Sequence, residues 1–427
     1  MSKSFIVTNA QYLGELVDIA VQDGRIAAVA PHGTLPASFA VSSGTDANID
    51  AQGLKIFPSF IDCHVHLREP GFEYKEDIAS GLKAAAHGGF GAVMAMANTR
   101  PVNDSASVTR TMIDKARALY PHGPRLHPVG AATVGLEGKE LAPMAELAEA
   151  GCVAISNDGV PVGGAELFRH CMEYAHTCGR IVIDHCEDPT LAKGAHMNEG
   201  ATSGRIGVKG QSVVAESLQA ARDILLADYL GIPVHLAHIS CTQSVDLIRW
   251  AKERGAPVTA ETCPHYLLLD DTELENYSTM AKVNPPLRTP ADVASIRAAL
   301  KDGTIDILVT DHAPHAEHEK ECTLDEAPNG ISGLDTAVAL TWELVRQGVL
   351  TEQDLILRWC HEPARIFNLS ANRFNPGDPA DFFLFDPEEL WVLTPEAMHS
   401  KGKNSPFLGR KLTGKVTAHW LGGHRVA

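Results

Sequence analysis

Two histidines and an arginine follow one another at the end of an apolar run near residue 60. The stretch "FPSFIDCHVHLREPG", residues 57–71, places His64 and His66 one residue apart and Arg68 two positions further on. Residues two apart in a strand point to the same side, so both imidazoles would share one face. Two imidazoles buried without partners are costly, whereas one divalent metal ion satisfies both. The spacing therefore indicates a metal site.

Other polar residues occur near the ends of later apolar runs. Asn98 ends the run at 89–98, and the runs at 152–159, 180–188, 233–240 and 305–315 carry Asp158, His185, His238 and Asp311. By the same alternation His185 shares a face with Ile181 and Ile183, His238 with Val234 and Leu236, and Asp311 with Ile307 and Val309. These side chains are expected to converge at one place.

The converging residues offer more ligands than one tetrahedral ion takes. They are His64, His66, Asp158, His185, His238 and Asp311. Imidazole and carboxylate ligands suit Zn²⁺ or a similar ion, and six of them fit two ions that share a carboxylate. Such a pair lowers the pKa of water and polarises a carbonyl group, which indicates hydrolytic chemistry.

Each of these residues also has an ordinary interpretation. Asp158 with Gly159 is a strong turn pair, Asp311 suits a loop cap, Arg68 a surface ion pair and Asn98 a turn. A lone histidine is most often a core or surface residue, which is the interpretation we give to His87, His122, His127, His170, His176, His196 and His235. Only the joint placement of the others at the ends of successive runs favours a metal centre.

The apolar runs themselves predict the architecture. Eight of them, at 56–66, 89–98, 125–133, 152–159, 180–188, 233–240, 257–265 and 305–315, alternate with helical patterns. This order predicts a (β/α)₈ barrel over 55–367, with polar residues at the carboxyl ends of its strands. Residues 1–54 and 368–427 have short strand patterns and predict one small β domain built from both chain ends. A doubly wound open sheet is the weaker alternative, because no glycine-rich phosphate loop follows the first run.

The composition of the chain limits the kinds of binding partner and the cellular location that we expect. The chain has 427 residues, 44% of them hydrophobic, and a formal net charge of −17, which argues against a nucleic-acid or anionic-membrane surface. There is no apolar run of the roughly 18 residues that a membrane helix needs and no signal-peptide pattern. Nine scattered cysteines without CxxC spacing indicate reduced thiols in a cytoplasmic protein.

The motifs together resemble the dihydroorotases of the amidohydrolase superfamily. "DCHVHLREPG" and "VTDHAPH" are similar to the two signatures of that family, and "MANTRP", "NDG", "IDHCED", "AHIS", "ETCPHYL", "VNPPLR" and "APNGISG" extend the likeness over about residues 55–335. The resemblance implies zinc, two ions per chain. It implies that His64, His66 and Asp311 bind the more buried ion, that His185 and His238 bind the second, and that Asp158 bridges them.

The same resemblance implies the substrate and the mechanism. Arg68, Asn98 and His315 match positions that hold the substrate's carboxylate, and Asn284 with the backbone of Asn329 and Gly330 matches positions that hold the pyrimidine ring. The implied reaction is reversible cyclisation of N-carbamoyl-L-aspartate to (S)-dihydroorotate, in the de novo synthesis of pyrimidines. Metal-bound hydroxide attacks, and Asp311 acts as general acid and base. A homodimer is the implied oligomer, and association with aspartate transcarbamoylase is a further expectation.

Two other functions remain open at this point. An allantoinase or hydantoinase would share the barrel and the metal pair, but its substrate gives Arg68 no carboxylate to bind, and "SNDG" offers no bridging lysine. A dihydroorotase-like scaffold subunit of aspartate transcarbamoylase would be inactive and lack metal ligands, whereas all six are present here. The polar stretch 314–330 is either a mobile lid or an ordinary exposed loop.

Overall fold

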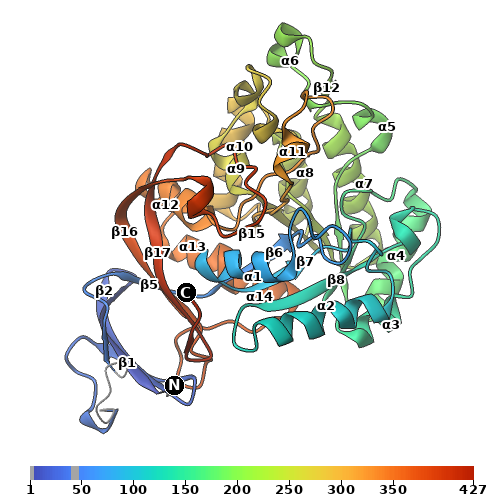
Figure 1. The fold of residues 1–427 in the computed structure, drawn as a ribbon. Helices are drawn as coiled ribbons and strands as arrows, with labels where there is room; N and C mark the ends of the chain where they lie inside the picture. Colours follow the sequence, from blue (N-terminus) through green and yellow to red (C-terminus); the bar gives the residue numbers. More distant parts are fainter. Residues whose placement is uncertain (1–3, 40–47) are drawn as a thin grey trace.

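Eight parallel strands form the central sheet of this computed structural model, which describes residues 4–39 and 48–427 (Figure 1). Neighbours in the sheet are also neighbours in sequence among the barrel strands. Their bounds are β6 Phe60–Val65, β7 Phe90–Ala95, β8 Arg125–Ala131, β9 Ala154–Ser156, β10 Ile181–Asp184, β13 Val234–Leu236, β14 Val258–Thr262 and β15 Ile307–Leu308. This parallel order is that of a barrel.

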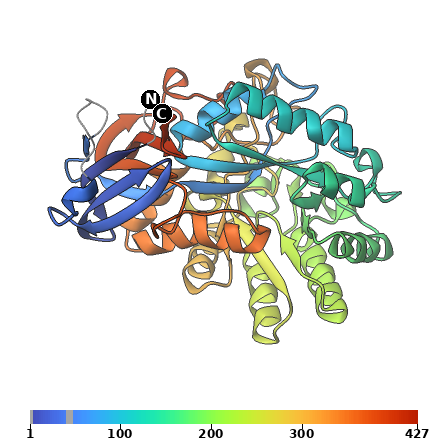
Figure 2. The same cartoon turned by 90° about the horizontal axis from the view of Figure 1, so that it is seen from below.

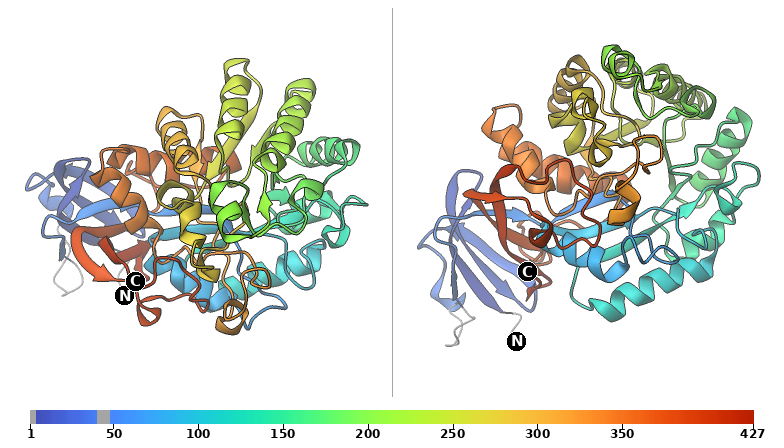
Figure 3. Two further views of the ribbon diagram at one scale, coloured as in Figure 1. Left: turned by 90° about the horizontal axis from the view of Figure 1, so that it is seen from above. Right: turned by 45° about the horizontal axis from the view of Figure 1, so that its top comes forward.

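A single bridge nearly closes the barrel between its first and last strands. Val65 of β6 pairs in parallel with His312, just after β15, and the His66 amide donates to the His312 carbonyl at 2.8 Å. Helices surround the strands (Figure 3). They are α1 Ile78–His87, α2 Ala106–Leu119, α3 Met144–Ala150, α4 Ala165–Thr177, α7 Val214–Leu230, α8 Thr242–Glu253, α10 Pro290–Asp302 and α12 Ala337–Arg346. The predicted (β/α)₈ fold is confirmed.

A second, mixed sheet joins the two ends of the chain beside the barrel (Figure 2). It contains β1 Phe5–Tyr12, β2 Glu15–Gln22, β3 Arg25–Pro31, β4 Asn48–Asp50, β5 Lys55–Pro58, β16 Phe382–Val392, β17 Lys411–Leu421 and β18 His424–Arg425. The link between the ends is the antiparallel pairing of β5 with β16. We propose 54/55 and 367/368 as domain boundaries, which leave β5 on the barrel side although it pairs within the second sheet. Residues 1–3 and 40–47 of the predicted segment 1–54 lie outside the described residues.

Short elements at the carboxyl ends of the strands carry much of the barrel mouth. They are α5 Pro189–Ala192, β11 Met197–Asn198, α6 Ala201–Ile206, β12 Gly210–Gln211, α9 Pro264–Leu268, η3 Asp271–Leu274, η4 Thr279–Ala281 and α11 Glu317–Lys320. After α12 the chain runs through α13 Glu352–Ile356, the π-helical turn η5 Leu357–His361 and α14 Glu362–Phe367. None of the helices in the described ranges is both long and apolar enough to cross a membrane.

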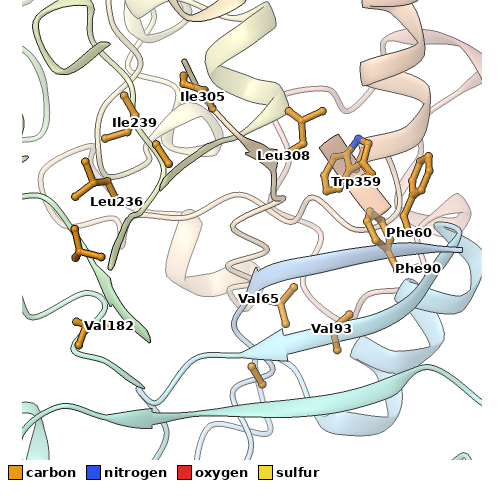
Figure 4. Close-up of a cluster of buried hydrophobic side chains, with 14 of the residues drawn as sticks. Phe60, Val65, Phe90, Val93, Val182, Leu236, Ile239, Ile305, Leu308 and Trp359 are labelled. Atoms are coloured by element: carbon orange, nitrogen blue, oxygen red, sulfur yellow. The ribbon is translucent and has the colours of Figure 1, made fainter. Parts of the chain in front are cut away.

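Apolar side chains fill the layer between strands and helices (Figure 4). Trp359 of η5 is fully buried, stacks on Phe60 with ring centroids 6.0 Å apart and meets Phe90 edge-on at 5.2 Å. Its indole N–H donates to the Thr341 hydroxyl at 3.3 Å, which satisfies its one polar atom. The aromatic group holds the amino-terminal ends of β6 and β7 against the helical layer.

The alternation of side chains holds within β13 but fails just beyond its end, at the site residue His238. Val234 and Leu236 pack in the layer facing the helices, whereas His235 bonds to Thr259 and Glu261 of β14. His238 lies two residues beyond the strand with a φ of +33°, so the chain has turned before it. The prediction that His238 shares the face of Val234 and Leu236 is therefore wrong.

We expect Trp359→Ala to lower the free energy of unfolding by about 3–5 kcal/mol, because the large cavity removes contacts with two aromatic rings. Thermal and denaturant unfolding would measure the loss. Trp250→Ala is the matched control, since Trp250 is 42% exposed and its removal leaves no buried cavity. Similar losses in the two variants would contradict the packing argument.

Candidate metal centre

Every predicted ligand lies at or just after the carboxyl end of a barrel strand. His64 is the second-last residue of β6, and His66 directly follows that strand. Asp158 comes two residues after β9, and His185 directly follows β10. His238 and Asp311 follow β13 and β15 at positive φ, +33° and +46°, conformations that non-glycine residues seldom adopt. The barrel thus brings side chains from five strands to one point, and the strained backbone turns two of them inward.

The ligand atoms face one another at distances that suit metal coordination. Asp158 Oδ1 lies 3.4 Å from His64 Nε2, His185 Nδ1 and His238 Nε2, and Asp158 Oδ2 lies 3.4 Å from His66 Nε2. Asp311 Oδ1 is 3.1 Å from His66 Nε2 and 3.6 Å from His64 Nε2. Ligands about 2.1 Å from a tetrahedral ion lie about 3.4 Å apart, so these spacings match the edges of two coordination polyhedra. Asp158 alone touches both groups, as a bridging carboxylate would.

The chemistry of the donors also fits a bound cation. His64 Nε2 is fully buried and has no hydrogen-bond partner, although two carboxylates face it. His185 Nδ1 and His238 Nε2 are 2.8 Å apart and both are directed at Asp158. Among the described residues, His64 with His66 and Asp311, and His64 with Asp158 and His238, form compact buried ligand groups. A buried nitrogen without a partner is costly, and a divalent ion satisfies it.

The two carboxylates remain ionised despite their burial. Burial by itself raises the pKa of Asp158, but the surrounding His64, His185 and His238 outweigh it and hold that pKa well below its ordinary value. Burial likewise opposes ionisation of Asp311, and His66 and His64 outweigh it and lower its pKa. Both side chains are therefore negatively charged at neutral pH and available as metal ligands.

A buried glutamate that sequence reasoning missed orients His64. Glu261 of β14 accepts from His64 Nδ1 at 2.6 Å and from His235 Nε2 at 3.0 Å. The bond fixes the tautomer of His64 so that Nε2 faces the site. His235, interpreted above as an ordinary core residue, belongs to this layer. A signal did exist: Thr259 and Glu261 alternate with apolar Val258 and Ala260, which places a carboxylate inside the barrel.

Two more ligands have oriented partners. His66 Nδ1 donates to Asn98 Oδ1 at 2.8 Å, which leaves the Asn98 amide nitrogen beside Gly159 at the cavity. His185 Nε2 lies 3.3 Å from Asn284 Nδ2 and 3.6 Å from Glu187 Oε2, and Asn284 in turn donates to Glu187 at 2.8 Å. Burial opposes the ionisation of Glu187, but His185, Asn284 and Gln211 lower its pKa to about 2.

A cavity of about 200 Å³ opens above the ligands. Its lining comprises His66, Arg68, Asn98, Asp158, Gly159, His185, His238, Val283, Asn284, Asp311, Ala313, Asn329 and Gly330. Of the predicted site residues only His64 and His315 are absent from this wall: His64 lies fully buried beneath it, and His315 lies behind Arg68 and Asn329. The structure thus brings all twelve predicted residues into one neighbourhood.

Arg68 presents a guanidinium to this cavity without a carboxylate partner. Arg68 Nε donates to the Pro314 carbonyl at 3.1 Å, and no ion pair of this side chain occurs within residues 4–39 and 48–427. His315 Nε2 lies 2.8 Å from the Asn329 carbonyl. Burial, together with the charges of Arg68, Lys320 and Lys75, lowers the pKa of His315 to about 2, so it is a neutral donor to that carbonyl. An unpaired guanidinium beside a cation centre suits an anionic ligand.

A third buried group, outside the mouth, has a different explanation. Asp184, Cys186 and Asp223 lie close enough to share an ion. However, Arg222 Nη2 contacts Asp223 at 2.7 Å and Asp184 at 3.3 Å, and burial raises the pKa of the Cys186 thiol well above its ordinary value. The guanidinium offsets part of this negative charge, and burial beside Asp184 raises the pKa of Asp223 well above its ordinary value, so the group needs no bound ion to be buried.

Comparison with known sequences agrees with this site. Residues 53–244 match the family described as "Dihydro-orotase-like". The chain is 45% identical over 421 residues to a protein of Geobacter metallireducens named dihydroorotase, covering 99% of this chain and 97% of that one. It is 46% identical over 409 residues to a dihydroorotase of Geotalea daltonii, covering 96% and 94%.

Comparison with solved structures gives the same fold at greater distance. The L-hydantoinase (dihydropyrimidinase) of Arthrobacter aurescens superposes with a TM-score of 0.86 at 23% identity, covering 99% of this chain and 96% of that one. The dihydropyrimidinase of Brevibacillus agri superposes with a TM-score of 0.79 at 22% identity, covering 99% and 94%. At this identity the likeness concerns the scaffold alone.

We expect Glu261→Gln to weaken metal binding by about 10–100-fold, because the neutral amide no longer supports the basicity of the His64 imidazole. Metal retained after equilibration with a graded series of chelator concentrations would measure the affinity. Glu253→Gln, at an exposed position of α8, is the control. Equal retention in both variants would show that Glu261 does not act on the ligand.

Proposed function

This chain belongs to the dihydroorotase family, and from that premise we propose that it catalyses the reversible cyclisation of N-carbamoyl-L-aspartate to (S)-dihydroorotate and water in pyrimidine biosynthesis. The observation that carries the proposal is the unpaired guanidinium of Arg68 in the wall of a cavity whose floor is the His/Asp cluster. Dihydroorotate has one carboxylate, on the ring carbon that the methylene separates from the amide carbonyl that is cleaved. The site offers an anion-binding group and a hydrolytic centre at matching positions.

The ligand set is proposed to hold two zinc ions, His64, His66 and Asp311 on one and His185 and His238 on the other, with Asp158 between them. When bound, such a pair supplies an activated water at neutral pH and polarises the amide carbonyl. The imidazole and carboxylate donors support zinc.

Asp311 is the residue we propose as general acid and base. It lines the cavity and is ionised, since the imidazoles of His66 and His64 outweigh the effect of burial on its pKa. In hydrolysis it takes the proton of the attacking water and delivers it to the ring nitrogen as the C–N bond breaks. In ring closure it accepts the proton of the carbamoyl nitrogen as that bond forms.

The remaining polar residues are proposed to orient the substrate. Arg68 and the Asn98 amide would hold the carboxylate, with His315 fixing the loop behind them. Asn284 and the backbone of Asn329 and Gly330 would hold the ring. Glycine is required at 330, because its φ is +144° and a Cβ there would lie 2.6 Å from the Ala313 carbonyl oxygen.

A cyclic amidase for substrates without a carboxylate is the second candidate, since the hydantoinases share this scaffold. Two features of the chain argue against it. A substrate without a carboxylate would give the Arg68 guanidinium no anion to bind. The proposed bridging position is occupied by Asp158 rather than by a lysine. The third candidate, an inactive scaffold subunit, is opposed by the presence of all six ligands: five lie in the two compact groups, and His185 contacts Asp158 and His238. A cytoplasmic homodimer, with or without aspartate transcarbamoylase, completes the proposal.

We expect the metal-loaded protein to turn over dihydroorotate, and Arg68→Met to lower kcat/KM about 100-fold, equivalent to about 2.7 kcal/mol, because the charge-assisted bonds to the carboxylate are lost. Steady-state kinetics on dihydroorotate and on dihydrouracil, which has no carboxylate, would test this. Metal counting confirms loading, and Arg110→Met on the exposed face of α2 is the control. Faster turnover of dihydrouracil than of dihydroorotate would overturn the substrate assignment.

We expect Asp311→Asn to lower kcat by about 1,000-fold, because a neutral amide cannot move the proton. Metal analysis on the same sample separates this loss from loss of an ion. Retained turnover in a fully loaded variant would exclude Asp311 as the acid and base.

A further inference from the structure

Two lysines at the barrel mouth are buried without any carboxylate partner. Lys282, just after η4, and Lys320, at the end of α11, are each 3% exposed. Neither ammonium forms an ion pair with a described residue, whereas the neighbouring Lys75 pairs with Glu319 at 2.8 Å. Burying an ammonium is costly even when it is fully hydrogen-bonded, so two such groups at the mouth call for an explanation beyond packing.

Both ammonium groups donate to backbone carbonyls instead. Lys320 Nζ reaches the carbonyls of Pro328 at 2.7 Å, Thr279 at 3.1 Å and Lys282 at 3.5 Å. Its three N–H donors therefore meet three acceptors from two separate segments. The same segments are joined again by the Thr279 hydroxyl, which donates to the Lys320 carbonyl at 2.6 Å.

Lys282 makes the reciprocal connection. Its Nζ donates to the carbonyls of Leu324 at 2.5 Å and Asp325 at 3.3 Å, and lies 3.3 Å from His196 Nδ1. Lys320 thus connects the segment that begins at residue 315 to residues 279–282, and Lys282 connects to residues 324 and 325 of the same segment. We call these two side chains and their carbonyls the lysine clasp.

The lysine clasp joins the segments that carry the proposed ring-binding groups. Asn284 is two residues from Lys282. The amide of Gly330 donates to the Lys282 carbonyl at 2.9 Å, the same carbonyl that Lys320 approaches. Asn329 lies next to Pro328, which Lys320 binds, and its carbonyl is held by His315. Loss of either ammonium would remove side-chain bonds that join residues 316–328 to residues 279–282, while the Asn404 side chain still holds His315 and Gly330 at the two ends.

The charges of the lysine clasp also suit an anionic substrate. Burial and the like charges of Lys282 and Arg68 lower the pKa of Lys320 to about 7 against the raising effect of Cys322 and Glu319. With Arg68 they form a positive region in a chain of net charge −17. An anion bound at Arg68 would favour the charged form of Lys320 and so tighten its bonds to the loop.

We propose that Lys282 and Lys320 are positioning residues that fasten residues 315–330 to residues 279–284, so that Asn284, Asn329 and Gly330 face the substrate together. The role of these lysines in substrate binding rests on the proposed function, whereas their fastening of the two segments does not. The polar stretch 314–330, expected to be either a lid or an exposed loop, is then a segment whose closed position depends on two buried ammonium groups.

The test uses full-length, metal-loaded protein carrying Lys320→Met, Lys282→Met or both, with Lys301→Met on the exposed face of α10 as control. Without substrate, amide hydrogen exchange of residues 316–330 is expected to rise about tenfold in each clasp variant and not in the control. Metal content is expected to stay unchanged. Uniform loss of protection over the barrel, or no change at 316–330, would overturn the clasp.

Kinetics then test the positioning role. The KM for dihydroorotate is expected to rise about tenfold with kcat within about threefold of wild type, because binding is weakened without loss of the acid, base or metal. The two lysines fasten the same segment, so the double variant is expected to lose little more than either single variant. Additive effects, or losses in kcat alone, would contradict a shared clasp.

Gln variants cover the case in which methionine prevents folding. Lys320→Gln and Lys282→Gln keep N–H donors without the charge, and the same local rise in exchange and in KM is expected from them. If wild-type protein shows no turnover of dihydroorotate, the proposed function fails, while the exchange experiment still decides the clasp.

Discussion

Four imidazoles and two carboxylates packed together, with carboxylate oxygens 3.1–3.6 Å from imidazole nitrogens, are the constraint on which the rest of the structure depends. Asp158 is 5% exposed and has His64, His66, His185 and His238 around it at 3.4 Å. Such a group is stable only if positive charge balances the carboxylates and each imidazole presents a lone pair to the centre. A divalent metal pair meets both conditions. The barrel contributes rigidity, because the ligands leave the ends of strands whose pairing fixes their spacing.

The outer partners show how the same centre is kept in one protonation pattern. His64 Nδ1 donates a hydrogen bond to Glu261 and His66 Nδ1 donates one to Asn98, so both rings turn Nε2 toward the carboxylates. His185 is reversed: Nδ1 faces Asp158 and Nε2 faces Asn284 and Glu187. Asn98 and Asn284 each contact a metal-ligating histidine and also line the cavity. A substrate that binds to them would therefore be held in a fixed position relative to the metal centre.

Sequence reasoning succeeded where the signal is local and failed where it is not. The HxH pair, the polar ends of six of the eight apolar runs and the two β-rich chain ends all follow from short patterns, and the fold they predict is confirmed. Alternation failed at His238, because a left-handed residue past the strand reverses the facing that a period of two assigns. Glu261, 197 residues from His64, and the clasp lysines depend on partners distant in the chain. The residue types of Glu261 and the two lysines do not by themselves reveal these distant partners, although the inward position of Glu261 was predictable.

The fold alone does not identify the ligand of this chain. The hydantoinase barrel superposes over nearly the whole chain at 23% identity, a likeness that concerns the scaffold. Positive charge lies at one side of the mouth: Arg68 faces the cavity, and Lys282 and Lys320 lie behind it, bonded to carbonyls and, for Lys282, also close to His196 Nδ1. Burial and the neighbouring positive charges lower the pKa of Lys320 to about 7, so an anion bound between these groups and the metal centre would favour its charged form. The proposed preference for a ring that carries a carboxylate would then follow from the same arrangement that holds the loop in place.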